Sequence, residues 1–219
     1  MTTPSFPTIS TRLLLQGPLG PLEVSVDPIE SPTPSQNTVA ILCHPLSTEG
    51  GSMNNKVITM TARSLRESGV ATVRFNFRGV GQSAGQFDDG AGEADDLRAI
   101  AAWVRQQRPE WSLWLAGFSF GAYVSLLVAD ALNADGLISI APPVGRWDFS
   151  KIVQPHCPWL VVQGEDDEIV DPHEVYAWVE SLIPPPELLR IPEASHFFHH
   201  KLIDLRTGIQ RGVTPWLSR

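Results

Sequence analysis

The chain has 219 residues, of which 42% are hydrophobic and 18% are charged, and its formal net charge is −8. This size suits one folded α/β domain and leaves no room for a second full domain. The negative charge argues against a surface for nucleic acid or for an anionic membrane, because no basic patch compensates for it. We therefore expect a single domain over residues 1–219, with residues 1–10 as a loose lead-in.

The two cysteines and the start of the chain indicate a reducing compartment. Cys43 and Cys157 each lie beside an apolar, strand-like segment, so buried free thiols are expected rather than a disulfide. The start of the chain has no basic stretch followed by a long apolar run, and Leu13–Leu15 is too short for a signal peptide or a membrane span. We expect a cytoplasmic protein.

The predicted elements begin with two short runs of alternating hydrophobicity, 12–16 and 21–27, which indicate antiparallel strands. The polar, proline-bearing stretch 31–37 is expected to be a loop. Continuous apolar runs then alternate with amphipathic segments. These predict, in order, strand 39–43, helix 54–68, strand 71–76, helix 92–107, strand 112–116, helix 120–132, strand 136–140, strand 159–163, helix 172–182, strand 187–191 and a helix from about 199. The alternation predicts an α/β fold with a mostly parallel sheet and ligands at the carboxyl ends of its strands.

Residues Gly117–Gly121 have the Gly-x-Ser-x-Gly pattern of a nucleophile elbow. In such an elbow the serine occupies a strained turn between a strand and a helix, and small residues two positions away let the two elements approach. Residues 111–116 have the pattern of a strand, and residues 122–129 have that of an apolar helix. We therefore predict that Ser119 is a nucleophile rather than a surface serine in a packing turn.

A serine hydroxyl becomes nucleophilic when a base accepts its proton, and histidine is the usual base. The chain has six histidines, which are His44, His156, His173, His196, His199 and His200. His196 is best placed, because it lies on the loop that follows the last predicted strand. His199 and His200 are expected on a helix surface and would make a poor metal site, so no metal and no other cofactor is predicted.

The third group must be an acid that orients the histidine and stabilises its charged form. Residues 164–171 carry five carboxylates directly after a buried strand. Asp171 stands before a proline at the start of a helical run, which explains it as an N-cap. Among the others we choose Asp167, although spacing alone does not separate it from Asp166.

An oxyanion hole requires backbone N–H groups that point at the developing negative charge. Phe120 follows the nucleophile and should supply one of them. The other should come from the loop after strand 39–43, where Pro45 has no N–H to give. That leaves Leu46 as the expected donor, with Ser47 as the alternative.

Three further motifs carry a family resemblance, and they are Cys43-His44-Pro45-Leu46, Gly50-Gly51-Ser52-Met53-Asn54-Asn55-Lys56 and Arg74-Phe75-Asn76-Phe77-Arg78-Gly79-Val80-Gly81-Gln82-Ser83. With the elbow and the acid and histidine loops, nearly the whole chain resembles the α/β-hydrolase superfamily. More narrowly, it resembles small lidless bacterial serine hydrolases that are distantly similar to dienelactone hydrolases. The resemblance implies the order Ser119, Asp167, His196, and its pattern Gly-x-x-Asp-x-x-Val selects Asp167. Dienelactone hydrolases have a cysteine nucleophile, so their substrate is not carried over.

Many α/β-hydrolases insert a cap domain after the strand that follows the nucleophile helix, but residues 141–158 are too few to form one. We therefore expect a shallow, open site. Trp147 and Phe197 are the expected substrate-binding walls, with Phe149 and Phe198 as further candidates, and core packing is an equal alternative for each. The segment 76–83 is expected to form a structural turn in which Arg78 bonds backbone carbonyls rather than a substrate anion.

Together these residues predict a serine hydrolase that cleaves a carboxylic ester or thioester through an acyl-enzyme. Its expected partner is a small-molecule ester or acyl substrate, with no nucleic acid and no membrane. The same groups could instead cleave a short peptide or transfer an acyl group to an acceptor other than water. A non-catalytic binding protein on a hydrolase scaffold is a further alternative, because a fold does not determine a function.

Overall fold

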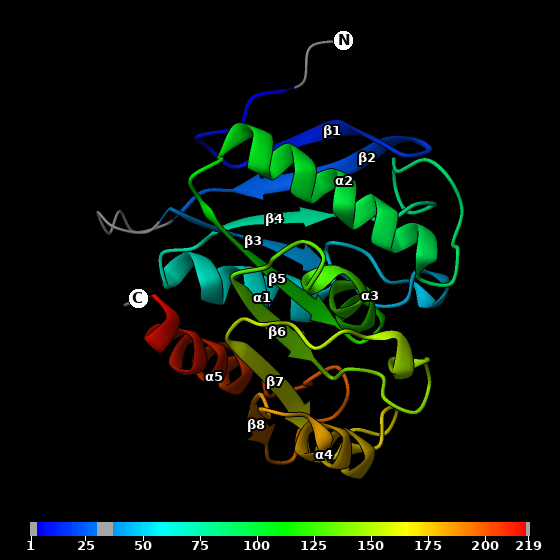
Figure 1. The fold of residues 1–219 in the computed structure, drawn as a ribbon, viewed down its shortest axis with the longest axis vertical. Helices are drawn as coiled ribbons and strands as arrows, with labels where there is room; N and C mark the ends of the chain where they lie inside the picture. The colour runs from blue at the N-terminus through cyan, green and yellow to red at the C-terminus, as the bar shows by residue number, and fades with distance from the viewer. Residues whose placement is uncertain (1–3, 30–36, 218–219) are drawn as a thin grey trace.

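The computed structural model describes residues 4–29 and 37–217, so the predicted loop 31–37 lies outside the described residues except for Asn37. One sheet of eight strands is covered by helices on both faces (Figure 1). Its strand order is β1-β2-β4-β3-β5-β6-β7-β8. The first two strands form an antiparallel hairpin and β2 pairs antiparallel with β4, whereas the other neighbours pair in parallel. The predicted α/β fold with a mostly parallel sheet is confirmed.

The bounds of the elements follow the predicted ranges to within three residues. The strands are β1 Thr11–Gly17, β2 Gly20–Asp27, β3 Thr38–Cys43, β4 Ala71–Phe75, β5 Ser112–Phe118, β6 Gly136–Ile140, β7 Trp159–Gly164 and β8 Glu187–Ile191. The α-helices are α1 Lys56–Glu67, α2 Ala91–Gln107, α3 Phe120–Ala129, α4 Pro172–Ser181 and α5 Leu202–Val213. Short 3-10 helices are η1 Ser47–Glu49, η2 Phe149–Lys151 and η3 Thr214–Trp216.

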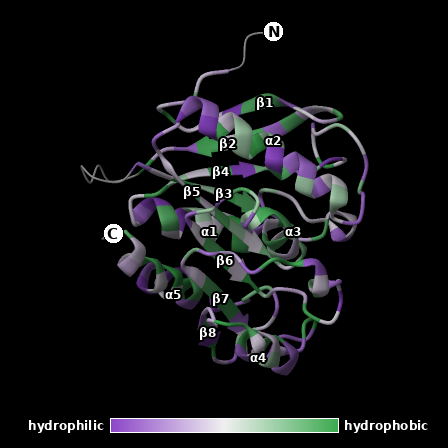
Figure 2. Ribbon diagram, in the orientation of Figure 1, coloured by the Kyte–Doolittle hydropathy of each residue, from purple (hydrophilic) through white to green (hydrophobic). Residues whose placement is uncertain are grey.

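The sheet separates two apolar core layers. Helices α2, α3 and α4 pack on one face, and α1 and α5 pack on the other. The central strands β3, β6 and β7 are buried along their whole length, because helices cover both of their faces. Figure 2 shows the apolar residues concentrated in these strands, while the polar residues lie mainly toward the outside of the helices. Burial of this apolar surface is the main stabilising contribution to the fold.

The carboxyl ends of the parallel strands determine where the functional loops meet. Because β3, β5, β6, β7 and β8 run in the same direction, the loops that follow them emerge at one edge of the sheet (Figure 1). These loops carry the predicted nucleophile, acid, histidine and oxyanion donors. The segment between β6 and β7 contains only the three-residue η2, so it forms no cap domain over that edge.

The start of the chain differs from the expected loose lead-in. Phe6 is buried, and its ring stacks on Trp103 of α2 with the ring centroids 5.5 Å apart. The indole N–H of Trp103 donates to the Pro4 carbonyl oxygen at 2.9 Å. Arg108 also places its guanidinium over the Phe6 ring, 4.9 Å from the centroid. The described part of the lead-in is therefore anchored, because Phe6 packs on Trp103 of α2.

The last helix begins at Leu202 rather than near His199. Phe198 and His200 have φ angles of 54° and 61°, which a regular helix does not allow, so the chain turns there before α5 begins. His199 and His200 are exposed on this turn, and their expected place on a helix surface is wrong. Among the described residues, no cluster of three or more His, Cys, Asp or Glu side chains could hold a metal ion.

Both cysteines are free, as predicted, but only Cys43 is buried, and Cys157 is half-buried. Cys43 is fully buried at the end of β3, and its burial raises the pKa of the thiol far above the ordinary range. Burial raises the pKa of Cys157 to about 11. Neither thiol is therefore ionised near neutral pH, which makes both poor nucleophiles. Within the ranges that the structure covers, no helix is both long and apolar enough to span a membrane.

Candidate active site

Ser119 occupies the sharp turn between β5 and α3. Its φ and ψ angles are 53° and −121°, a conformation that L-residues rarely adopt. The turn is held by the Ser119 N–H, which donates to the Ile140 carbonyl oxygen at 2.8 Å, and by the Ala122 N–H, which donates to the Ser119 carbonyl oxygen at 2.8 Å. The strained strand-to-helix geometry predicted for the elbow is present, and it exposes the serine at the edge of the sheet.

The two glycines of the elbow allow a close approach of backbone segments. A Cβ atom on Gly117 would lie 2.1 Å from the carbonyl oxygen of Gly121. A Cβ atom on Gly121 would in turn lie 2.1 Å from the carbonyl oxygen of Cys43, at the end of β3. The absence of a side chain at Gly121 therefore lets the start of α3 pack directly against the loop that follows β3. This contact brings the expected oxyanion donors beside Ser119.

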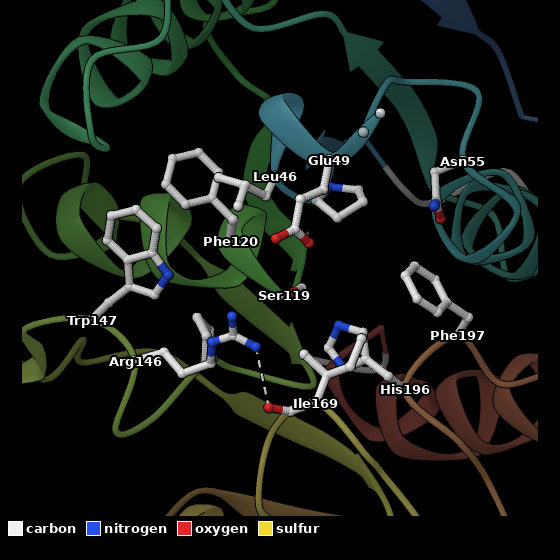
Figure 3. Close-up of a pocket in the computed structure, with 14 residues that line it drawn as sticks. Leu46, Glu49, Asn55, Ser119, Phe120, Arg146, Trp147, Ile169, His196 and Phe197 are labelled. Carbon is white, nitrogen blue, oxygen red and sulfur yellow. Dashed lines mark hydrogen bonds between the residues drawn. The ribbon is translucent and has the colours of Figure 1, made fainter.

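His196 and Asp167 form a buried hydrogen-bonded pair. Nδ1 of His196 lies 2.8 Å from Oδ2 of Asp167, and the two residues are only 2% and 7% exposed. Because the carboxylate accepts the Nδ1 proton, Nε2 is left free to act as a base. The His196 ring lies beside Ser119 in the same pocket (Figure 3). Within the described ranges no hydrogen bond joins Ser119 Oγ to His196, as is common for catalytic pairs without substrate.

The Asp167 carboxylate accepts four hydrogen bonds. Oδ1 accepts from the N–H groups of Ile169 and Val170 at 2.9 and 2.8 Å. Oδ2 accepts from Gln163 Nε2 at 2.9 Å and from His196 at 2.8 Å. Burial alone would raise the pKa of Asp167, but the hydrogen bond and charge of His196, together with the two backbone N–H groups, hold it below its ordinary value. Asp167 is therefore ionised near neutral pH.

The other carboxylates of this loop have different surroundings. Asp166 is exposed, and its backbone N–H donates to the Ala194 carbonyl oxygen at 3.1 Å. The Asp171 side chain accepts from the His173 N–H at 2.9 Å, which makes it the N-cap of α4 as predicted. The Glu168 side chain accepts from the backbone N–H of His196 at 3.0 Å. Tertiary geometry thus separates Asp167 from its neighbours, which spacing alone did not.

Phe120 and Leu46 both line the pocket that contains Ser119. Phe120 is the first residue of α3, so its N–H has no intrahelical partner. Leu46 precedes η1, and its carbonyl oxygen accepts from the N–H groups of Glu49 and Gly51, which curls the loop around it. The alternative donor Ser47 lies outside the lining of this pocket. The expected donor pair therefore lines the same pocket as Ser119.

His44 anchors the loop that carries Leu46. Its Nδ1 lies 2.6 Å from the Pro45 carbonyl oxygen, and its Nε2 accepts from the Phe77 N–H at 3.1 Å. Burial lowers the pKa of His44 to about 4, so the ring is neutral, with its proton on Nδ1. The Pro45 carbonyl and the Leu46 N–H belong to one planar peptide group, so this bond orients the N–H as well. His44 is thus part of the loop support and is not the base.

The pocket is small and open to solvent, with a volume of about 170 Å³. Trp147 and Phe197 line it, as expected. Trp147 packs on Phe120 with the ring centroids 4.9 Å apart. Phe149 instead packs against Trp178 with a centroid separation of 5.0 Å, and Phe198 is fully buried in the core. For these last two candidates, core packing is the correct alternative.

Charged and polar residues that sequence reasoning did not select also face the pocket. Glu49, Asn55 and Arg146 line it, and Figure 3 shows the Glu49 carboxylate and the Arg146 guanidinium directed into the space above Ser119. Arg146 also donates to the Ile169 carbonyl oxygen at 3.3 Å. In the sequence, such residues resemble any solvated loop side chains, and only the fold shows that they lie at the site.

Arg78 has a different partner from the one expected. Its guanidinium donates to both carboxylate oxygens of Asp96 on α2, at 3.1 and 2.9 Å, rather than to backbone carbonyls. The Arg78 backbone N–H also donates to Asp96, at 2.9 Å. Because both side chains are buried, the charged guanidinium requires a paired acid. The structural role expected for Arg78 is retained, but the bonded group is a carboxylate.

Residues 37–208 match the family described as the alpha/beta hydrolase domain. The chain belongs to the α/β-hydrolase family. A match of this extent includes the elbow, the acid loop and the histidine loop. The α/β-hydrolase fold, without a lid between β6 and β7, agrees with the fold predicted from the sequence.

Similar proteins cover nearly the whole chain. An α/β serine hydrolase without a lid from Xanthomonas campestris is 63% identical, with a TM-score of 0.96 and 99% of each chain covered. An α/β serine hydrolase homologue from Coxiella burnetii is 44% identical, with a TM-score of 0.91, over 95% of this chain and 100% of that one. An uncharacterized protein of Rickettsia prowazekii (strain Madrid E) is 34% identical over 208 residues, which are 90% of this chain and 86% of that protein.

Proposed function

We propose that the protein hydrolyses carboxylic esters or thioesters through an acyl-enzyme. In this proposal Ser119 is the nucleophile, His196 is the base, and Asp167 orients and stabilises the histidine. The observation that carries the proposal is the 2.8 Å bond between His196 Nδ1 and Asp167 Oδ2, next to a serine in the strained elbow conformation. Similarity to proteins described as α/β serine hydrolases supports the same reaction class.

The proposed reaction has two halves. Ser119 Oγ attacks the acyl carbon while His196 Nε2 takes its proton, and the same proton then passes to the departing alkoxide or thiolate. Water next attacks the acyl-enzyme with His196 again as base, and Ser119 recovers its proton. The N–H groups of Phe120 and Leu46 stabilise the oxyanion in both halves. Asp167 remains ionised and stabilises the imidazolium that forms in each half.

The pocket favours short acyl groups. Its volume of about 170 Å³ lies below the range of roughly 300–1,000 Å³ that drug-sized ligands occupy. The aromatic rings of Trp147 and Phe197 provide apolar walls, and the segment between β6 and β7 forms no cap that would enclose a long chain above them. Activity on aryl esters should therefore fall as the acyl chain lengthens beyond a few carbons, which a series from acetate to octanoate measures.

A serine-directed probe tests the nucleophile. In the Ser119→Ala variant, labelling by a fluorophosphonate and turnover of short aryl esters should both be lost, because no other group replaces the hydroxyl. The control is Ser52→Ala, which removes a half-buried serine on the neighbouring loop and should keep both activities. Retained labelling of Ser119→Ala would show that Ser119 is not the nucleophile. Parallel panels of esters, thioesters and peptide amides identify the leaving group.

A further inference from the structure

Gln163 is a buried polar residue on a strand that is otherwise apolar. It lies on β7 after Leu160, Val161 and Val162, and it is fully buried. Within the described residues its Oε1 atom has no hydrogen-bond partner. A buried carbonyl oxygen without a partner is destabilising, because it has given up its hydrogen bonds to water. The fold alone therefore favours an apolar side chain here, and the glutamine calls for another explanation.

The nitrogen of the same amide group, Nε2, does have hydrogen-bond partners. Gln163 Nε2 lies 2.9 Å from Asp167 Oδ2 and 3.2 Å from the Gly164 carbonyl oxygen. An ionised carboxylate only accepts hydrogen bonds, so the amide N–H groups must face it. The reverse orientation would place Oε1 against the carboxylate. The bond to Asp167 therefore dictates the amide orientation and leaves Oε1 without a partner.

The oxygen that Gln163 contacts is the one that holds His196. Asp167 Oδ2 accepts from both Gln163 and His196, at 2.9 and 2.8 Å, while Oδ1 is occupied by two backbone N–H groups. A carboxylate has about four acceptor positions. With all four in use, the carboxylate cannot rotate, and a single direction remains for the histidine N–H. The hydrogen bond from Gln163 also partly neutralises the negative charge of Asp167 Oδ2, to which His196 is bonded.

We propose that Gln163 is a positioning residue for the reaction, which holds Asp167 Oδ2 so that His196 Nε2 faces Ser119. The inference rests on the hydrolase function proposed above. It goes beyond the three catalytic residues, because it assigns a role to a side chain that touches neither the substrate nor the nucleophile. The carbonyl oxygen of Gln163 is buried without a hydrogen-bond partner because the N–H group at the other end of the amide binds Asp167.

The test replaces the amide with a side chain of similar length that cannot donate, in Gln163→Met. We expect kcat for a short aryl ester to fall by about 10- to 100-fold, as for the loss of one hydrogen bond to a charged group, with KM little changed. The acid limb of the pH profile should move to higher pH, because a carboxylate with one donor fewer attracts the protonated imidazole more strongly. Gln163→Leu serves as a second variant if Gln163→Met does not fold.

The matched control is Ser139→Ala on the neighbouring strand β6. Ser139 is also fully buried, and its Oγ accepts from the Trp159 indole N–H at 3.0 Å, a bond that does not involve the site. This variant should lower the free energy of unfolding and leave the pH profile in place. In Gln163→Met the opposite pattern is expected, with a displaced profile and little change in stability, since the lost bond is offset by removal of the unpaired carbonyl.

A measurement that does not depend on turnover separates this inference from the proposed function. By NMR, the His196 Nδ1 proton should exchange with water faster in Gln163→Met than in the wild type or in Ser139→Ala, because a carboxylate that is free to rotate opens this hydrogen bond more often. If the wild type is active but Gln163→Met keeps its kcat, pH profile and proton exchange, the role of Gln163 is wrong and the hydrolase function stands. If the wild type lacks Ser119-dependent turnover, the function fails, and proton exchange alone decides whether Gln163 holds the pair.

Discussion

The backbone of Leu46 has a φ angle of −51°, which lies in the range that a proline ring imposes. A Leu46→Pro substitution therefore removes the backbone N–H and keeps a φ angle that the proline ring allows. If this N–H stabilises the oxyanion, kcat should fall by about 100- to 1,000-fold, as for the loss of other such donors. Steady-state kinetics on a short aryl ester, with thermal unfolding as a check of folding, measures the effect.

Leu46→Ala is the matched control, because it removes the side chain and keeps the N–H. Its kcat should stay within severalfold of the wild type. If Leu46→Pro were folded and fully active, Leu46 would not be an oxyanion donor, and the Ser47 N–H would become the donor to test.

His44 should make the stability of the protein depend on pH. Its pKa is about 4 in the folded state and 6.5 for the free side chain, so the unfolded chain binds a proton first as the pH falls. Its contribution to stability is therefore fully present above pH 6.5 and declines between pH 6.5 and 4, by about 3 kcal/mol in all. Urea unfolding over this range should show a shallower slope against pH for His44→Gln. His173→Gln, which changes an exposed histidine, should keep the wild-type slope.

At the scale of elements, α2 supports the site through a buried ion pair. Asp96 of α2 binds the Arg78 side chain. The residue before Arg78 is Phe77, and its backbone N–H donates to His44. The helix passes so close that a Cβ atom on Gly92 would lie 1.9 Å from the Arg78 guanidinium. The turn after β4 therefore contacts α2 through Arg78, and through Phe77 it contacts the loop that carries the expected oxyanion donor.

The Asp96→Ala substitution should lower the free energy of unfolding by about 3–5 kcal/mol, because it leaves the Arg78 charge buried without its main partner. Asp95→Ala is the matched control on the same helix, since it breaks only the exposed pair with Arg98. That loss should be under about 1 kcal/mol. Equal losses in urea denaturation of the two variants would show that the buried pair contributes no more than the exposed one.

The order of the elements was predictable because it rests on local periodicity. Runs such as β3 and β7 are apolar throughout, and the helices carry apolar stripes, so each element is defined within its own residues. The predicted start of α5, near residue 199, is earlier than the observed start at Leu202. The turn at Phe198 and His200 depends on positive φ angles, which no sequence pattern indicates. Phe6 was missed for a related reason, since its partner Trp103 is nearly one hundred positions away.

At the scale of the whole molecule, charge should affect which substrates react. The chain carries a net charge of −8, yet Arg146 and Glu49 are both directed into the pocket with opposite signs. For an anionic ester compared with a neutral one, Arg146→Gln should lower kcat/KM and Glu49→Gln should raise it. Each change should be about two- to tenfold at low ionic strength and should shrink in high salt.

The control for this comparison is Arg211→Gln on α5, which changes the net charge equally but lies outside the pocket lining. It should alter the ratio of anionic to neutral ester turnover much less than Arg146→Gln does. If all three variants shift the ratio only in step with net charge, the two pocket charges have no specific effect on substrate choice.

By itself, the sequence determined the α/β class, the elbow around Ser119 and the N-cap at Asp171, because each depends on residues that are neighbours along the chain. The family resemblance added the choice of Asp167. Tertiary structure alone decided that Gln163 and His196 share one oxygen of that carboxylate, and that His44 holds the loop instead of serving as a base. The contacts of His196 with Asp167 and of His44 with Phe77 join segments that meet only when parallel strands end at one edge of the sheet, so no local pattern encodes them.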